Sequence, residues 1–445
     1  MRKLLVLMLL LCVGMLSAQE KETLNLTLEE AINYALDNNR SAINAQRTIE
    51  AAKKQKWETT ATGLPQISAS VDYQNYLKQQ VSLIPAEFFG GEAGTFESIT
   101  FGTKQSVSAS ATLNQLIFDG SYLVGLQSAK VYLQISENAK QKTDLQIRKT
   151  VIASYGNVLL AEENIAILKN NKQVLEKNLF ETDQMFKNGL SEEEHVEQLQ
   201  ITLLQVDISL KNALRLKNLA YDMLKVTLGT NITSTVTVTD DLATLTQQNI
   251  DLELFEATLN IENNIDYKIA KNNEVSQELL LKLEKSKGLP TLSAFINGGY
   301  QGYASKEFTF LKSTQDWFGS SLFGVSLNVP IFSSLGRSAA TQRMKIELDK
   351  AKTDLTETEQ QLMLQFEQAK SEYQYSVEFY ESAKQNLKLA ERIEYKNQTK
   401  YTEGIATSFD LRQAQTQLYT AQQEYLQAML NVLTKKAALE TILNN

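Results

Sequence analysis

The residues that build catalytic and metal-binding sites are scarce in this chain. Its 445 residues include one cysteine, Cys12, and one histidine, His195. A single cysteine excludes a disulfide framework and a cysteine-based zinc site, and a single histidine leaves no material for a His-rich metal centre. The sequence also lacks a glycine-rich phosphate loop and any group of carboxylates that stands out from charged helix faces. These absences predict a protein that is not an enzyme and needs no cofactor or metal.

Positive charge is also in short supply. The chain carries 44 Lys+Arg against 52 Asp+Glu, for a formal net charge of -8. Proteins that bind nucleic acid normally present a basic face that displaces counterions from the phosphates. The charge balance therefore argues against a nucleic-acid partner. The hydrophobic fraction of 43% is nevertheless sufficient for a packed core, so the chain is expected to fold.

Long apolar runs are confined to the N-terminus. Two basic residues precede an apolar run that ends near Ala18. This order is typical of a secretory signal peptide, and the run is too short to cross a bilayer as a helix of about 20 residues. We predict a signal peptide over residues 1–18; lipidation at Cys12 is disfavoured because Leu11 is not small. With no later apolar run of membrane-spanning length, a membrane-embedded part would have to be a β-barrel.

Helix breakers are rare and clustered. Prolines occur at only four positions: Pro65, Pro85, Pro290 and Pro330. Between and after them, apolar side chains recur at every seventh residue in two long segments, for example Val151, Val158 and Ile165 in the first and Leu348, Leu355 and Leu362 in the second. Seven-residue spacing predicts coiled-coil packing. Each segment would form a helix of about 65 residues, roughly 100 Å long.

The chain repeats itself. Asn38-Asn39 and Asn263-Asn264 have the same separation as Gly63-Leu64-Pro65 and Gly288-Leu289-Pro290. Each half follows the order helix, strand pair, long helix, turn, shorter helix. We predict a first repeat over 19–229 (helix 27–62, strands 65–82 and 103–118, helices 121–187 and 191–228), a linker over 230–250, and a second repeat over 251–445 (helix 252–287, strands 290–300 and 320–332, helices 337–401 and 405–443).

The windows around the prolines alternate between apolar and small polar residues. Ile67, Ala69 and Val71, for example, alternate with Ser68 and Ser70. Such alternation is typical of a transmembrane β-barrel, but also of a half-buried soluble sheet. The small uncharged polar face favours a water-filled lumen. Four strands cannot close a barrel, because single-chain barrels begin at about eight strands, so several copies would have to share one. We predict Pro65, Pro290 and Pro330 as strand-entry residues.

Over residues 24–443, the sequence resembles the TolC-type outer-membrane efflux proteins. The resemblance is carried by Leu26–Ile32 with Ala35-Leu36 and Asn38-Asn39, by both Gly-Leu-Pro motifs, and by Tyr401–Gly404 followed by Ser408, Asp410-Leu411 and Ala414-Gln415. It implies a mainly α fold with a small membrane β-barrel. Three protomers would each give four strands to a shared barrel of twelve. Their long coiled-coil helices would continue as a periplasmic α-barrel.

The resemblance also implies a function. The chain would be an outer-membrane exit duct of a tripartite efflux or type I secretion system, spanning from the outer membrane into the periplasm. It would passively conduct small molecules, ions or proteins to the exterior. Its partners would be two further copies in a homotrimer, outer-membrane lipid, a periplasmic adaptor protein and an inner-membrane pump of RND or ABC type.

The same resemblance suggests roles for single residues. Gly189 and Gly404 would form the helix–turn–helix tips that meet the adaptor. Asp410 looks like an acidic position of the family's periplasmic gate, and Tyr401 looks like its gating tyrosine. A second acidic position falls on Gln413, and His195 stands where the first repeat of relatives has aspartate. These departures alter the family's ionic contacts at the gate.

Two alternatives stay open on the residues alone. His195 follows three glutamates, so it is either a solvated helix position or a pH-sensing group. As a whole, the chain is either the duct or a soluble periplasmic coiled-coil scaffold whose short sheets serve as dimer contacts. The scaffold would appear in a soluble periplasmic extract, whereas the duct would appear only after membrane solubilisation.

Overall fold

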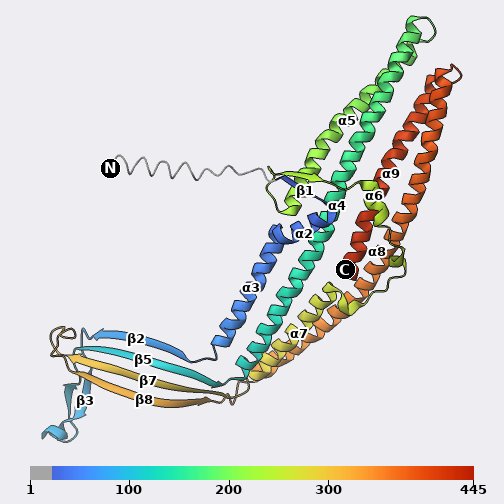
Figure 1. Cartoon of the computed structure of the whole chain (residues 1–445). Helices are drawn as coiled ribbons and strands as arrows, with labels where there is room; N and C mark the ends of the chain where they lie inside the picture. Colours follow the sequence, from blue (N-terminus) through green and yellow to red (C-terminus); the bar gives the residue numbers. More distant parts are fainter. Residues whose placement is uncertain (1–22, 445) are drawn as a thin grey trace, which may run out of the picture. The chain divides into compact units, whose positions relative to one another are not determined.

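The computed structural model describes residues 23–444, so the predicted signal peptide lies outside the described residues. The expected fold class, mainly helical with few strands, is confirmed (Figure 1). In chain order the elements are β1 (Thr23–Leu26), α2 (Leu28–Asn38), α3 (Arg40–Ala61), β2 (Gln66–Asn75), β3 (Val81–Pro85), η1 (Ala86–Phe89), β4 (Phe96–Thr100), β5 (Gln105–Phe118), α4 (Gly120–Lys187), α5 (Glu193–Leu228), β6 (Thr235–Val238), α6 (Leu242–Gln248), η2 (Leu252–Phe255), η3 (Ile261–Asn263), α7 (Ile265–Ser286), β7 (Thr291–Ala304), β8 (Trp317–Asn328), α8 (Gly336–Thr402) and α9 (Ser408–Leu443).

Two compact units cut across the two sequence repeats. The helical unit comprises the residues up to Glu50, Ile135–Asn272 and the residues from Thr353 onward. The sheet unit comprises Ala51–Gln134 and Asn273–Lys352. Each unit therefore contains corresponding parts of both repeats, because equivalent elements pack on each other instead of each repeat folding alone.

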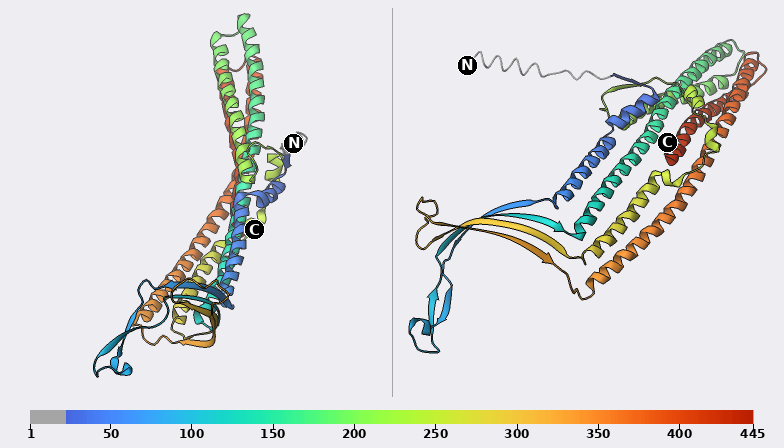
Figure 2. Two further views of the ribbon diagram at one scale, coloured as in Figure 1. Left: turned by 90° about the vertical axis from the view of Figure 1, so that its left-hand side faces the viewer. Right: turned by 60° about the horizontal axis from the view of Figure 1, so that its bottom comes forward.

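The sheet unit is built on four antiparallel strands in the order β2, β5, β7, β8, which lie side by side in Figure 2. The register aligns the apolar residues of neighbouring strands, as in the row Ile67, Leu113, Ile296 and Phe323. Because side chains alternate between the faces of a strand, one face of the sheet is apolar and the other is mostly small and polar. On the apolar face Ile67, Val71, Phe323 and Leu327 are each more than 60% exposed. On the polar face, the Ser70 and Ser110 hydroxyls lie 3.3 Å apart.

Both outer strands of this sheet are open. Among residues 23–444, no strand is hydrogen-bonded to the outer side of β2 or β8, and nearly all residues of these two strands are exposed. The strand predicted over 65–82 in fact ends at Asn75, and β3 begins a separate hairpin with β4. An open edge presents unpaired backbone groups that a further strand can satisfy.

Proline marks the strand ends in two ways. Pro65 and Pro290 directly precede β2 and β7, as expected. The expectation that Pro330 starts a strand is wrong, because β8 ends at Asn328 and Pro330 follows it. Proline has no NH group to donate to a strand neighbour, so it is tolerated just outside either end of a strand.

The helical unit has an extended apolar core. Its fully buried side chains include Val151, Val158, Leu224 and Leu439, and the core also contains Tyr155 and Tyr373. Of the helices within residues 23–444, one, α4 (Gly120–Lys187), holds a stretch that is apolar enough to cross a membrane by length and composition. Half of that stretch is buried inside the protein, so core packing accounts for its apolar character.

Residues 230–264, predicted as a linker and the start of a helix, form short elements with β1 instead. These elements are called the connecting layer below. The predicted linker 230–250 contains β6, which pairs in parallel with β1, and the helix α6. The helix predicted from residue 252 begins only at Ile265, after two short 3-10 turns. The side chains of Asp251 and Asn260 accept bonds from backbone NH groups two residues later and so favour turns over helix.

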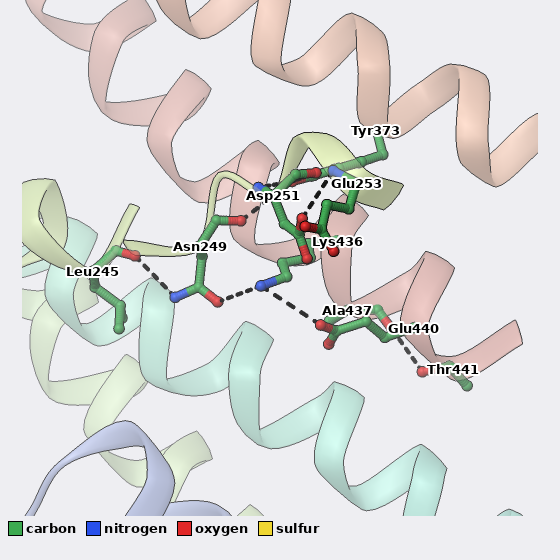
Figure 3. Close-up of polar contacts among 9 residues, drawn as sticks. All are labelled: Leu245, Asn249, Asp251, Glu253, Tyr373, Lys436, Ala437, Glu440 and Thr441. Carbon is green, nitrogen blue, oxygen red and sulfur yellow. Dashed lines mark hydrogen bonds and ion pairs between the residues drawn. The ribbon is translucent and has the colours of Figure 1, made fainter. Parts of the chain in front are cut away.

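Two buried tyrosines hold the connecting layer to the long helices. The Tyr155 hydroxyl on α4 donates to Asp240 Oδ2 (2.8 Å), and its oxygen also lies 2.9 Å from the Leu26 carbonyl oxygen. Burial raises the pKa of Tyr155, so it remains a neutral donor. The Tyr373 hydroxyl on α8 accepts from the backbone NH of Asp251 (2.8 Å), as Figure 3 shows. The same figure shows Lys436 on α9 donating to Asn249 Oδ1 at 3.2 Å.

Candidate functional site

Two asparagines join short helices end to end. Asn39 interrupts the predicted helix 27–62 with an extended backbone (ψ 131). Its Nδ2 donates to the carbonyl oxygen of Thr227 at the end of α5 (2.7 Å), and its Oδ1 accepts from the NH of Ser41 at the start of α3 (2.7 Å). One side chain thus satisfies both a helix C-terminus and a helix N-terminus, whose backbone groups otherwise lack partners.

The second repeat contains the same joint. Asn264 Nδ2 donates to the carbonyl oxygen of Ile442 at the end of α9 (2.8 Å), and its Oδ1 accepts from the NH of Asp266 at the start of α7 (2.8 Å). The repeat comparison identified Asn39 and Asn264 as equivalent residues. Only the structure reveals that each side chain links the end of one helix to the start of another by hydrogen bonds.

The turns that join the paired helices depend on glycine. Gly189, between α4 and α5, has φ +74, and Gly404, between α8 and α9, has φ +73. The NH of Leu190 donates to the carbonyl oxygen of Met185, and that of Ile405 to Lys400, closing both helices in the same way. The predicted helix–turn–helix geometry is therefore present at both positions. Their contact with an adaptor stays a prediction.

Near these turns the helices are connected by polar side chains. The Thr182 and Tyr401 hydroxyls, on α4 and α8, lie 3.0 Å apart, and Thr182 is fully buried. Further contacts between helices join Asn178 Nδ2 to Gln398 Oε1 (2.8 Å), Asn171 Nδ2 to Gln422 Oε1 (2.9 Å) and the Ser408 hydroxyl to Gln198 Oε1 (3.1 Å). Hydrogen bonds between side chains therefore join the helices near the turns, beside buried apolar side chains such as Leu175 and Leu199.

The side chains that recur at every seventh residue in the sequence already include these polar residues. The series that contains Phe366, Tyr373 and Tyr380 continues at the same spacing to Glu394 and Tyr401. Burial raises the pKa of Glu394. Polar side chains thus join the apolar ones in the core toward the turns, where Val196 and Leu411 are also buried. Extending each seven-residue series beyond its last apolar residue would have identified these polar residues from the sequence.

Asp410 has a local role in this structure. It occupies the third position of α9 and forms a reciprocal capping box with Thr407: Asp410 Oδ2 accepts from the Thr407 hydroxyl (2.7 Å) and backbone NH (3.0 Å). These hydrogen bonds from the side chain and backbone of Thr407 lower the pKa of Asp410. The carboxylate is exposed and stays charged at neutral pH.

The remaining gate candidates are not brought together with Asp410 by any described contact. Gln413 is exposed on α9. His195 lies at the start of α5, where its Nδ1 is 3.3 Å from the Ser191 hydroxyl. Within residues 23–444, no group of three or more His, Cys, Asp or Glu side chains is arranged to hold a metal ion.

The comparison with protein families finds a match that covers most of the chain. The profile described as outer membrane efflux protein matches residues 31–230 and 261–445. The two matched stretches fall one in each sequence repeat. A comparison with curated protein sequences finds no match.

Solved structures share the fold. VceC from Vibrio cholerae, an outer membrane protein, has a TM-score of 0.72 at 15% identity, covering 94% of this chain and 96% of that chain. The MtrE outer membrane channel of Neisseria gonorrhoeae also has a TM-score of 0.72, at 16% identity, covering 94% and 89%. The CmeC outer membrane channel of Campylobacter jejuni has a TM-score of 0.72 at 16% identity, covering 94% and 85%.

Proposed function

This chain belongs to the outer membrane efflux protein family and is an exit duct of the outer membrane that extends into the periplasm; from this premise we propose how it assembles and what it connects. Three copies would close one β-barrel and one helical tunnel. A periplasmic adaptor would join the tunnel to an inner-membrane pump of RND or ABC type. The duct itself performs no chemistry on its cargo, so transport is driven by the pump.

The open sheet carries this proposal. In lipid, the two unpaired edges of β2 and β8 would leave on the order of ten backbone groups without partners, each at a cost of several kcal/mol. That sum exceeds the stability of a typical fold, about 5–15 kcal/mol. Pairing β8 of one copy with β2 of the next removes the cost. The exposed apolar face of the sheet then faces lipid, and its serine-rich face lines the lumen.

The helical unit offers a second surface for assembly. One side of α5 displays an apolar stripe at helical spacing, each member more than half exposed: Ile201, Leu204, Ile208, Leu216, Leu219 and Met223. A contiguous apolar stripe of this kind marks an interface. We propose that a helix of the neighbouring copy covers it.

Fractionation tests the proposal as a whole. The mature protein should be extracted from outer membranes only by detergent, as a trimer, and should conduct ions when reconstituted in a planar bilayer. Recovery of a water-soluble monomer from the periplasmic extract would contradict it and favour the coiled-coil scaffold.

We propose that the polar end of the helical core is the gate. Separating helices whose contacts are hydrogen bonds exposes polar groups that water can satisfy, whereas separating an apolar core exposes apolar surface. On opening, the contact of Tyr401 with Thr182 and the contact of Asn178 with Gln398 would be replaced by hydrogen bonds to water. Gly189 and Gly404 would remain the adaptor-facing turns.

Tyr401→Phe should make this gate easier to open. The variant loses the contact with Thr182, which at about 0.5–1.5 kcal/mol shifts a closed–open equilibrium by roughly 2- to 10-fold per copy. Planar-bilayer recordings should show a higher mean conductance. Tyr395→Phe, on the same helix and 71% exposed, is the matched control and should behave as wild type. Equal conductance of all three proteins would exclude Tyr401 from the gate.

Asp410→Asn should weaken cation preference. Three copies of Asp410 would form an acidic ring around the tunnel and favour cations over anions. Asparagine keeps an acceptor oxygen for the capping bonds to Thr407, so the variant removes the charge while keeping the helix start. Reversal potentials in a salt gradient should move toward zero selectivity at unchanged trimer yield. An unaltered reversal potential would place Asp410 away from the pore.

A further inference from the structure

A hairpin stands outside the four-stranded sheet. In the part of the chain that the structure describes, strands β3 and β4 pair only with each other, within the connection from β2 to β5. Figures 1 and 2 show them projecting away from the four-stranded sheet. An isolated two-stranded hairpin is at best marginally stable in water. This hairpin therefore gains from a surface to pack against.

The hairpin exposes an unusual amount of apolar surface. Its register places Val81, Leu83 and Phe96 on one face, because Leu83 pairs with Ser98 and Pro85 with Phe96. Besides Tyr76, the connection that contains it has seven large exposed apolar residues: Leu77, Val81, Leu83, Phe88, Phe89, Phe96 and Phe101. A grouped apolar surface of this kind marks an interaction site.

The position of the hairpin points to a second copy of this chain. It follows β2, an open edge strand that pairs with β8 of the next copy if the proposed barrel is correct. Because β2 and β8 would pair antiparallel, the end of β2 meets the beginning of the neighbour's β8. The segment that precedes β8, residues 305–316, therefore lies at the same end. It exposes Leu311 (91%) and half of Phe308 (52%), whose ring also packs edge-on against Tyr73 of its own chain, with 5.7 Å between the ring centroids.

Charge distinguishes this occupant from a lipid surface. Residues 81–100 contain Glu87, Glu92 and Glu97 and no lysine or arginine, so an anionic membrane surface would repel the hairpin. They also contain no tryptophan or tyrosine, the residues enriched at membrane interfaces. The 305–316 segment instead carries Lys306 and Lys312, with Lys312 at 3.6 Å from its own Glu307.

We propose that the β3–β4 hairpin packs on residues 305–316 of the next copy and clasps the joint between protomers at the outer end of the barrel. Phe88 and Phe89 at its tip contact the neighbour's Phe308 and Leu311. The inference rests on the proposed trimer and adds to it a specific contact outside the strand pairing.

Cysteine cross-linking tests the clasp. Cleavage of the predicted signal peptide removes Cys12, so introduced thiols are the only ones in the mature chain. In outer membranes, Phe88→Cys combined with Leu311→Cys should give dimers and trimers with a short bis-maleimide reagent. Each single variant should stay monomeric on a denaturing gel. The mass of the detergent-purified complex is measured in parallel for all three variants.

The outcomes separate the clasp from the trimer. A trimeric mass without cross-linked dimers, or with a cross-link confined to one chain, overturns the clasp and leaves the proposed assembly intact. Dimers from Phe88→Cys alone also overturn it, because the hairpins would then meet each other across the mouth. A monomeric mass of the purified protein would instead overturn the assembly on which the clasp depends.

Discussion

Gly229→Ala is expected to destabilise the helical unit by about 2–5 kcal/mol. Gly229 ends α5 with φ +81, a left-handed conformation that costs about 1–2 kcal/mol with a side chain. A Cβ atom there would lie 2.2 Å from the backbone oxygen of Asn38, and backbone cannot swing aside as a flexible side chain does. Overpacking of this kind adds about 1–3 kcal/mol.

The substitution would disrupt the contact through which Asn39 links the end of α5 to the start of α3. Asn39 bonds the Thr227 carbonyl only because the end of α5 and the start of α3 approach closely. Moving either backbone to admit the methyl group breaks that bond and leaves helix-end groups without partners. The measurement is thermal and denaturant unfolding of the purified protein by circular dichroism, with trimer yield as a second readout.

Gly189→Ala is the matched control. Gly189 has nearly the same backbone conformation, φ +74, but a Cβ atom there would meet nothing within 4 Å. Only the left-handed strain of about 1–2 kcal/mol applies. Equal losses in the two variants would mean that close packing at Gly229 contributes nothing. A near-neutral Gly229→Ala would mean that the joint adapts freely.

Ala109→Arg is expected to prevent most of the protein from assembling in the outer membrane. Ala109 lies in the middle of β5, paired with Val71 and Tyr300 on the exposed apolar face. An arginine facing lipid near the bilayer midplane costs up to about 2–4 kcal/mol in each copy. Three copies of the substitution in one barrel would together approach the stability of a typical fold. Trimer yield from washed outer membranes measures the effect.

Ser110→Arg separates lipid exposure from general damage to the strand. Ser110 is the next residue of β5, so its side chain points to the opposite face, beside Ser70 and Gly299. An arginine there would lie in a water-filled lumen and should assemble at close to wild-type yield while altering ion selectivity. If Ser110→Arg fails to assemble and Ala109→Arg succeeds, the two faces are assigned the wrong way round.

The faces of the sheet were predictable because strand periodicity is local. A side chain's face depends only on its parity along the strand, so the alternation around Ile67 and Val71 predicted which residues share a face. The pairing order β2, β5, β7, β8 is not local. It depends on which strands the folded chain brings together, and so does the separation of the β3–β4 hairpin from the sheet.

The candidate gate was predictable in part. The resemblance named Tyr401 and Asp410 as gate positions, and those roles remain predictions. The structure adds what each touches: Tyr401 lies against Thr182, whereas Asp410 caps its own helix through Thr407. A partner more than two hundred residues away along the chain cannot be read from the spacing of residues near Tyr401.

The helical and strand periods, the duplicated design and the turns at Gly189 and Gly404 could be predicted from the residues alone, because these features depend on side-chain spacing and on local backbone freedom. The positions at which helices break and join became visible only in the folded chain. Asn39 and Asn264 link helices because each donates a hydrogen bond to the end of a helix that is remote in sequence. The pairing of β1 with β6 likewise depends on backbone hydrogen bonds between distant segments, and Tyr373 holds Asp251 from a helix more than one hundred residues away.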